Sequence, residues 1–423
     1  MFPVARKLNE ALDQFASVCD GPIGIAVSGG GDSRALLEIA YLWSRQTKRD
    51  IFALTVDHGL REEAAQEAEG VAARCKTLGI PHETLVWHHK SRRGSQARSR
   101  RARHALLANA VRAQGGSLLL MGHTYDDQLE TLFMRRARIA NEDGQAGLAA
   151  MRALAVSPVW PEGRGIFIGR PCLNIQRADL RTYLQDHDLD WVEDPTNDDM
   201  KYERVRVRRE LASCDRSELA ERLHTSSEVR AAQDSRLADW LAAYVTADAY
   251  GLVAFDAADL PSEAVLAEGL AWVLMAAAGT DRRARKEGRD MLAADIIASP
   301  RGFRARTLGG AQIAPRRGQL HIARDPGMIS ELPETPKIGL IWDGRFCLSP
   351  LDNMPSRDDL AQRLHGQDAE TSKTEQVPAL ARISYPNFTD AGFSTECVVA
   401  NRLEMVQKML RYSKLRVSQY NFV

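Results

Sequence analysis

The chain has 423 residues, which is too long for one core of ordinary size, so two or three domains are expected. Its 56 Lys and Arg residues balance its 56 Asp and Glu residues, so net charge predicts no polyanionic partner. The first residues lack the apolar core of a secretion signal, and no apolar window approaches the roughly 20 residues that span a bilayer. Its six cysteines form no C-x-x-C pair, which argues against structural zinc and favours reduced thiols. We therefore expect a cytoplasmic protein with no membrane partner.

The first half of the chain repeats one unit, in which a short β-rich run precedes a segment with helical periodicity. The runs are IGIAVS, IFALTVDH, HETLVWHH, SLLLMGHT and GIFIGRPCL, and the helical segments after them are 33–45, 61–78, 96–114, 126–138 and 177–187. This alternation predicts an α/β fold with a doubly wound, mostly parallel five-stranded sheet. Ligands bind such sheets beyond the carboxyl ends of the strands. The polar residues that fall at this edge are Ser28–Ser33, Asp57–His58, His123–Asp127 and Arg170–Pro171.

The pattern changes after about Arg209. Helical segments are expected at 217–245, 263–278 and 282–297, β material at 304–323, and a hairpin turn at Asp343–Gly344. We predict three parts: a catalytic domain over 1–215, a mainly helical middle domain ending in β segments over 216–330, and a small α+β region over 331–423.

The loop S-G-G-G-D-S, residues 28–33, lies between the first predicted strand and its helix. Gly29, Gly30 and Gly31 allow a tight turn and close approach to a ligand, and the following helix N-terminus favours anions. The amides and the hydroxyls of Ser28 and Ser33 suit a pyrophosphate group, and Asp32 suits Mg²⁺. The alternative is an ordinary turn in which Asp or Ser caps the helix. We favour phosphate binding, without the lysine of a P-loop.

This loop resembles the S-G-G-x-D-S signature of the pyrophosphatase-loop ATPases, which cleave ATP to AMP and pyrophosphate to adenylate a carbonyl oxygen. Further stretches resemble the bacterial tRNA(Ile)-lysidine synthetases. They are TVDHGLR (55–61), SQARSRRARHALL (95–107), GHTYDDQLETLFMR (122–135) and RPCLNIQRADLRTYLQDHDLDWVEDPTN (170–197). The resemblance covers about residues 20–210 and thins after that.

The resemblance implies an adenine nucleotide alpha-hydrolase-like fold and a ligase reaction. ATP would adenylate the C2 oxygen of cytidine 34 in the CAU anticodon of an isoleucine tRNA. The ε-amine of free L-lysine would then attack C2, giving lysidine, AMP and pyrophosphate. The cofactors implied are ATP and Mg²⁺, with Asp32 as the metal ligand. Alternatives are another pyrophosphatase-loop enzyme, such as a tRNA 2-thiolase or a small-molecule amidotransferase, and a regulator that binds ATP without turnover.

The residue types at the predicted edge suit this chemistry. Arg100 and Arg103 would surround the transferring phosphate. Asp126, Asp127 and Glu130 share helix faces and would grip the cationic lysine, although acids at a helix start also act as caps. His123 would position the base or a phosphate, or bond within its own loop. Asp57 and His58 would lie near the adenine, and an Asp at a strand end is often only a turn residue.

Local charge predicts the nucleic-acid surface. No acidic residue occurs between Glu83 and Asp126, whereas arginines are dense there, four of them within 98–103. A second basic run over 201–209 closes the first domain, and the middle and C-terminal regions are candidates for further tRNA contact. Such runs are also common on solvated helix faces. Val205 stands where the resembled family has an asparagine, and the sequence leaves a homodimer open.

Overall fold

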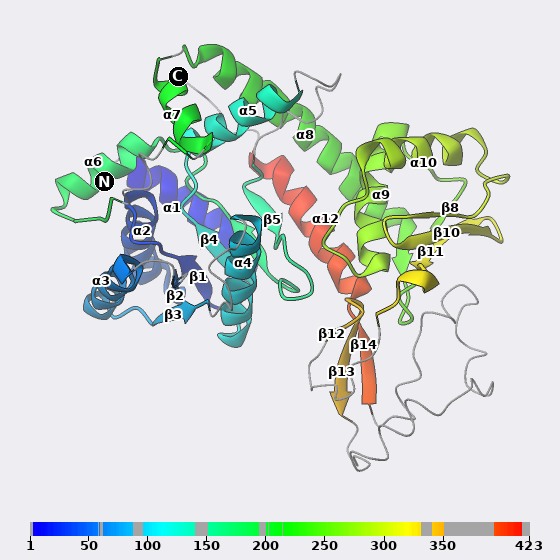
Figure 1. Ribbon diagram of the computed structural model, residues 1–423, viewed down its shortest axis with the longest axis horizontal. Coiled ribbons are helices and arrows are strands. Elements are labelled where there is room, and N and C mark those ends of the chain that lie inside the picture. Colours follow the sequence, from blue (N-terminus) through cyan, green and yellow to red (C-terminus); the bar gives the residue numbers. More distant parts are fainter. Residues whose placement is uncertain are drawn as a thin grey trace. The chain divides into compact units, whose positions relative to one another are not determined.

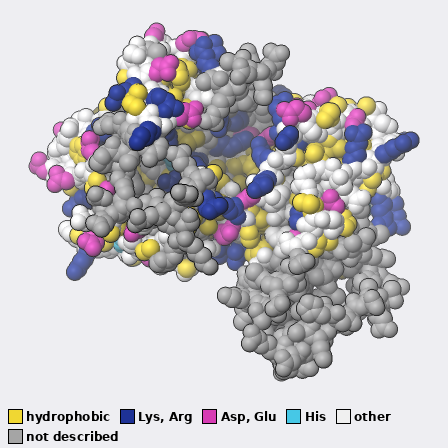
Figure 2. All heavy atoms as spheres, viewed as in Figure 1, with side chains coloured by type: hydrophobic (Ala, Val, Ile, Leu, Met, Phe, Trp, Pro, Cys, Tyr) yellow, Lys and Arg dark blue, Asp and Glu magenta, His cyan; other side chains and the backbone are white. Residues whose placement is uncertain are grey.

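The computed structural model describes residues 3–57, 59, 62–87, 96–139, 151–193, 200–201, 203–213, 215–330, 341–350 and 393–416. Contacts divide the chain into two units, one of Met1–Asp234 with Arg411–Val423 and one of Ser235–Leu410. The predicted three-part domain division stays a prediction. On the face drawn in Figure 2, both acidic and basic side chains are present among the described residues.

The first unit is built on a six-stranded sheet with the order β3-β2-β1-β4-β6-β5. The strands are β1 (Ile23–Ala26), β2 (Ile51–Asp57), β3 (His82–Val86), β4 (Leu118–Met121), β5 (Leu154–Val156) and β6 (Phe167–Gly169). All neighbours pair in parallel except β5, which runs antiparallel to β6 at one edge. The predicted doubly wound parallel sheet is confirmed, with its five strands at β1, β2, β3, β4 and β6. The edge strand β5 was not predicted.

Helices cover both faces of this sheet (Figure 1). The helices over 3–213 are α1 (Pro3–Ala16), α2 (Gly31–Thr47), α3 (Glu62–Leu78), α4 (Gln96–Ala113), α5 (Tyr125–Ile139), α6 (Arg177–Asp186) and α7 (Glu203–Ser213). Of these, α2, α3 and α4 contact the strands, whereas α5 packs against α7. Leu119 and Met121 pack with α4 residues on one face. Because side chains alternate along a strand, Leu118 and Leu120 point to the other face, where α1, α2 and α6 pack together. The side chains on both faces of β4 are buried, so this strand lies at the centre of the core.

The order in which strands are added to the sheet reverses at β1, since β2 and β3 lie on one side of it and β4 and β6 on the other. This strand pairs with β2 on one side and with β4 on the other, so the loops after β1 and β4 open into the same crevice. A Cβ atom on Gly122, just after β4, would lie 3.0 Å from the carbonyl oxygen of Asp32. The fold therefore brings the S-G-G-G-D-S loop against the segment that carries His123 and Asp127.

The second unit contains an antiparallel sheet and two buried helices. The sheet order is β7-β8-β11-β10-β9. Its strands are β7 (Val245–Ala247), β8 (Val253–Asp256), β9 (Arg306–Leu308), β10 (Ala311–Arg316) and β11 (Gln319–Arg324), and the helices are α9 (Glu263–Ala278) and α10 (Lys286–Ala298). The long helix α8 (Ser217–Tyr244) precedes them, and a short 3₁₀ helix, η3 (Pro326–Met328), follows the sheet. This arrangement agrees with the expected helical segments and the β material over 304–323.

A small three-stranded sheet follows in the second unit. It consists of β12 (Ile341–Trp342), β13 (Phe346–Pro350) and β14 (Phe393–Cys397), and α12 (Val399–Arg416) follows it. The predicted hairpin turn is confirmed, since Asp343 and Gly344 adopt φ of 48° and 66° between β12 and β13. Within the described ranges, no helix combines the length and apolar character needed to cross a membrane.

Candidate active site

The S-G-G-G-D-S loop joins β1 to α2 in a tight turn whose two hydroxyls are linked. The Ser28 amide donates to Ser33 Oγ at 3.1 Å, and the two hydroxyl oxygens lie 3.2 Å apart. Gly29 has φ of +85°, a conformation in which a side chain would be strained. No side chain caps the start of α2 at Gly30, so amides there remain available to an anion. This geometry fits the predicted phosphate loop better than the alternative of a side-chain-capped turn.

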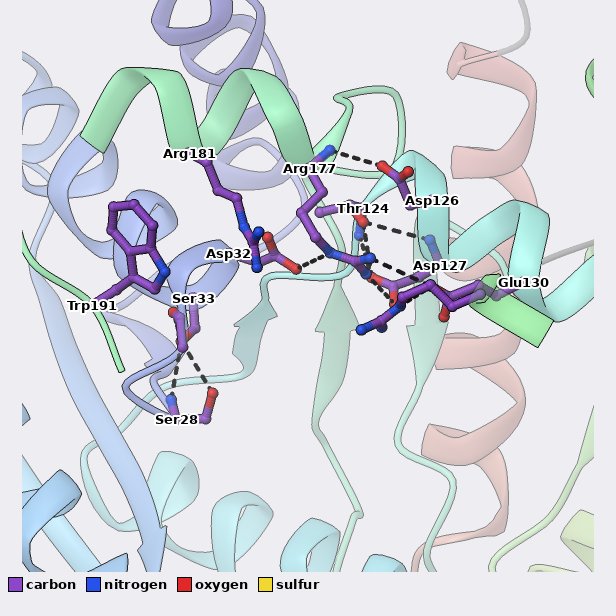
Figure 3. A network of polar contacts seen from close by, with 12 residues as sticks. Ser28, Asp32, Ser33, Thr124, Asp126, Asp127, Glu130, Arg177, Arg181 and Trp191 are labelled. Atoms are coloured by element: carbon purple, nitrogen blue, oxygen red, sulfur yellow. Dashed lines mark hydrogen bonds and ion pairs between the residues drawn. The ribbon is translucent and has the colours of Figure 1, made fainter. Parts of the chain in front are cut away.

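A short segment after α6 lies over the loop. The Val192 amide donates to the Gly29 carbonyl at 3.0 Å, and a Cβ atom on Gly31 would lie 3.3 Å from the Trp191 ring. The close approach of Trp191 therefore gives a reason for Gly31 to lack a side chain. Figure 3 shows Trp191 beside the loop serines.

Arg177 joins the loop to the carboxylates of α5. Its guanidinium donates to Asp32 at 3.0 Å, to Asp127 at 3.1 Å and to Glu130 at 3.4 Å. Figure 3 shows this side chain between Asp32 and the carboxylates of α5. Burial lowers the pKa of Arg177, but Asp127 and Asp32 more than compensate and raise it. The predicted metal ligand and two predicted lysine ligands thus share one buried cation.

Two arginines of α7 complete the ion-pair network. Arg204 donates to Glu130 and to Asp127, at 2.7 Å in each case, and Arg208 donates to Glu130 at 2.9 Å. Glu130 is only 2% exposed, so its charge needs these partners. The basic run over 201–209 was interpreted as a tRNA surface, whereas the structure turns Arg204 and Arg208 toward carboxylates. Their spacing of four residues places both on one face of the helix.

The acids at the start of α5 act as helix caps, which is one of the two roles that the sequence left open, and they also pair with arginines. Their binding of lysine stays a prediction. Asp127 Oδ2 accepts from the Thr124 amide at 2.7 Å and so caps its own helix, while Oδ1 accepts from Arg177 and Arg204. Asp126 accepts from the backbone amide of Arg177 at 2.8 Å and from the Arg216 guanidinium at 3.3 Å. Asp126 therefore caps α6 from outside that helix, whereas Asp127 and Glu130 face the centre of the network.

A second cluster is cationic and lies around Arg103 of α4. Burial and the nearby guanidinium groups of Arg100 and Arg204 lower the pKa of Arg103. The pKa of His123 is lowered well below its usual value by burial and by the same three arginines together with Arg170. Arg100, Arg103 and His123 are thus brought together, as predicted. Arg204 connects this cluster to Asp127 and Glu130.

Asp32 combines an ion pair to Arg177 with a place at the phosphate loop. Burial raises its pKa, and Arg177 opposes this effect. Within the described residues, no group of three or more His, Cys, Asp or Glu side chains could hold a metal ion. Magnesium is commonly bound by one or two carboxylates together with substrate phosphates. Asp32 at the phosphate loop therefore fits Mg²⁺ that arrives with a nucleotide.

The remaining predicted residues lie apart from the network. Asp57 accepts from the Gly59 amide at 2.7 Å, which is the turn role considered from the sequence, and His58 lies outside the described residues. Arg101 contacts the carbonyl of Trp160 and the carboxylate of Glu162, so part of the arginine-rich stretch serves local structure. The 140–150 loop and 194–199 also lie outside the described residues.

Sequence reasoning missed Arg177 and His104. Arg177 begins α6, in the stretch N-I-Q-R, and only its distance in sequence from the loop hid its role. His104 lies next to Arg103 and is almost fully buried. The sequence did contain a signal for His104, because this histidine stands between the arginines of 98–103 and the apolar residues that follow it.

Comparisons with known proteins agree with this geometry. The PP-loop domain family matches residues 3–214, and this match implies that the first unit binds ATP. The tRNA(Ile)-lysidine synthase of Hyphomonas neptunium is 42% identical over 329 residues, which cover 75% of this chain and 87% of that protein. Those of Ruegeria pomeroyi and Caulobacter vibrioides are 33% and 34% identical and cover 81% of this chain, with 80% and 77% of their own lengths matched. On these matches, the chain is a member of the tRNA(Ile)-lysidine synthase family and carries its PP-loop domain.

Proposed function

We propose that this protein is a ligase that joins free L-lysine to C2 of cytidine 34 in the CAU anticodon of an isoleucine tRNA. The reaction consumes ATP and releases AMP and pyrophosphate. The observation that carries the proposal is the single network that links Asp32 of the phosphate loop to Asp127 and Glu130. An enzyme that activates a base with ATP and then adds an amine needs an anion-binding loop and an amine-binding acid cluster side by side.

The residues divide between the two steps. The loop amides and the hydroxyls of Ser28 and Ser33 would hold the pyrophosphate portion of ATP while the C2 oxygen attacks the α-phosphorus. Mg²⁺ bound at Asp32 would neutralise phosphate charge. Guanidinium groups of Arg100 and Arg103 would stabilise the negative charge that develops on the transferring phosphate.

The amine step would use the acid cluster. Arg177 and Arg204 hold Asp127 and Glu130 toward each other. An ammonium group would take the place of the Arg204 guanidinium, while Arg177 keeps the two carboxylates in position. The amine must lose a proton before it attacks C2, and a carboxylate in this position would accept it. AMP then leaves with the former C2 oxygen. A cluster that already binds cations therefore suits lysine as the nucleophile.

The test is incubation of the purified full chain with CAU-anticodon isoleucine tRNA, ATP and radiolabelled lysine. We expect lysine incorporation that falls by at least about 100-fold in Asp32→Asn and Asp127→Asn. Asp179→Asn is the matched control, because this aspartate is exposed on the first turn of α6. ATP binding without AMP release in the presence of this tRNA would instead identify a regulator, and incorporation of sulfur would identify a thiolase.

A further inference from the structure

His104 is a buried histidine with no hydrogen-bond partner in the described part of the chain. Its side chain lies on α4, is 2% exposed, and has both ring nitrogens unpaired. Three nearby polar atoms share this state, namely His123 Nδ1, Arg103 Nε and Arg170 Nε. Buried polar atoms without a partner are rare in native proteins and usually mark a missing water or ion. Five such atoms on four neighbouring side chains indicate one missing group.

The charge around His104 indicates which kind of group is missing. Burial, followed by Arg103, Arg100 and Arg170, lowers the pKa of His104 to about 3. Burial and Arg100 lower the pKa of Arg170 to about 10, and this side chain is 8% exposed. Apart from burial, the main influences on the pKa of both residues are neighbouring arginines. A neutral water would fill hydrogen bonds here but would leave the positive charge uncompensated.

The contrast with the neighbouring network strengthens this argument. Arg177, Arg204 and Arg208 each pair with a carboxylate within 3.1 Å. The guanidinium of Arg170 instead donates to a backbone carbonyl, that of Arg152, at 2.8 Å. Within the described ranges, the first three arginines thus have carboxylate partners, whereas the hydrogen bond of the Arg170 guanidinium goes to a neutral carbonyl. A ligand that carries its own negative charge would give Arg170 an anionic partner.

We propose that His104, His123, Arg103 and Arg170 form a buried oxyanion site that binds a phosphate group of a substrate. Guanidinium and imidazole N–H groups would donate to the phosphate oxygens in charge-assisted hydrogen bonds. The phosphate comes either from ATP or from the RNA backbone beside the target base. This inference rests on the proposed function for its substrates, but phosphate binding can be measured without turnover.

The direct test is NMR of the full chain with ¹⁵N-labelled histidine. Inorganic phosphate, α,β-methylene-ATP and a CAU anticodon stem-loop RNA are added separately at pH 7, and the ring ¹⁵N signals of His104 are followed. We expect these signals to shift with the probe that fills the site, because a ring N–H gains an acceptor, whereas the ring signals of exposed His187 stay unchanged. A shift with phosphate or the ATP analogue assigns the site to ATP, and a shift with RNA alone assigns it to the tRNA. If none of the three probes shifts the His104 signals, the proposed site is wrong.

Substitutions give an independent measurement. We expect Arg170→Met and His104→Phe to weaken binding of the assigned probe by about 10- to 100-fold. Arg6→Met, at an exposed position of α1, is the control and should leave binding unchanged. If a variant does not fold, the NMR measurement on the wild-type chain still tests whether the site binds phosphate. Lysine incorporation without a His104 shift would overturn this site alone, whereas a His104 shift without lysine incorporation would overturn the proposed function alone.

Discussion

The Nε atom of Arg177 donates to Asp32 Oδ2 at 3.0 Å, although the two residues are 145 positions apart in the sequence. The contact connects the first turn of α6 to the first turn of α2, directly after the phosphate loop. Because the same guanidinium reaches Asp127, the position of the loop carboxylate depends on the position of the α5 carboxylates. Any ligand that displaces Arg177 from one partner therefore changes the other.

The first prediction concerns this guanidinium. In Arg177→Met, Asp32, Asp127 and Glu130 lose a shared cation, and the repulsion between them is no longer balanced. Removing one partner of a buried ion network typically costs about 3–5 kcal/mol, so we expect the free energy of unfolding to fall by an amount of this order. We also expect the KM for lysine to rise at least about 10-fold, with partial recovery in Arg177→Lys. Urea unfolding and lysine incorporation measure the two effects.

Arg181→Met is the matched control for this prediction. Arg181 lies one turn further along α6, is 47% exposed, and pairs with Glu193, which is also exposed. Surface ion pairs contribute about 0–1 kcal/mol, so little change in the free energy of unfolding is expected. Wild-type stability and wild-type KM in Arg177→Met would show that the carboxylates do not need this cation.

The second prediction concerns the contact between the loops after β1 and β4. A Cβ atom on Gly122 would lie 3.0 Å from the Asp32 carbonyl oxygen and 3.1 Å from Ser33 Cα. Both atoms belong to the backbone and cannot turn aside, so Gly122→Ala must displace the start of α2. We expect ATP binding to weaken by about 10-fold or more, as measured by equilibrium dialysis, because misplaced loop amides bind phosphate poorly.

Gly70→Ala is the control for the second prediction. Gly70 is exposed in α3, and a Cβ atom there would meet nothing within 4 Å. Alanine favours a helix over glycine by up to about 1 kcal/mol, so this variant should be slightly more stable and should bind ATP normally. Equal ATP affinities for the two variants would contradict the role given to the Gly122 contact.

The five parallel strands of the first unit were predictable because each is a short β-rich run that precedes a helical segment. Helix α9 was predicted with its observed bounds, and Gly279 ends it in the left-handed conformation. The three-residue strands β5 and β7 were missed because a run of this length carries little periodic signal, whereas β6, which is equally short, precedes a helical segment in the repeated unit. Helix α7 was missed because its arginines were read as a charged surface, although Val207 and Leu211 are buried.

The residue types of the site and their place at one edge of the sheet were predictable. Which side chains pair with one another there was not. The spacing of Asp127 and Glu130 places them on one helix face from sequence alone. Arg177 lies between these two residues and Asp32 because α6 packs against α2. This packing is tertiary structure, which the local sequence does not indicate. The same holds for His104, because its burial depends on what covers α4 rather than on α4 itself.

The third prediction concerns acid stability. The pKa of His104 is about 3 in the folded chain, against 6.5 for an ordinary histidine, so the unfolded chain binds more protons between these values. The free energy of unfolding should therefore fall as the pH drops below 6.5, by about 2 kcal/mol between pH 7 and pH 5 from this residue alone. His104→Phe cannot titrate, and its stability should fall less over the same range. Parallel pH dependences of the two chains in urea unfolding would contradict a buried neutral His104.

The fourth prediction concerns the end of α9 in the second unit. Arg402, from α12, is 8% exposed and donates to the carbonyls of Met275 at 2.9 Å and Thr280 at 2.7 Å. The Met275 carbonyl also accepts from the amides of Gly279 and Thr280, which follow α9. Because carbonyls at a helix C-terminus carry partial negative charge, a guanidinium stabilises them. Arg402→Met keeps much of the side-chain volume and removes both hydrogen bonds. Since each charge-assisted bond contributes about 1.5–3 kcal/mol, we expect the free energy of unfolding to fall by about 2 kcal/mol or more.

The comparison for Arg402 is Lys408→Met on the same helix. Lys408 is 55% exposed and lies 3.5 Å from Glu404, one turn earlier, so its loss should change the free energy of unfolding by less than about 0.5 kcal/mol. The two variants remove the same charge from α12 and differ in what that charge contacts. Circular dichroism during urea unfolding should therefore separate them, and equal midpoints would mean that the end of α9 does not depend on Arg402.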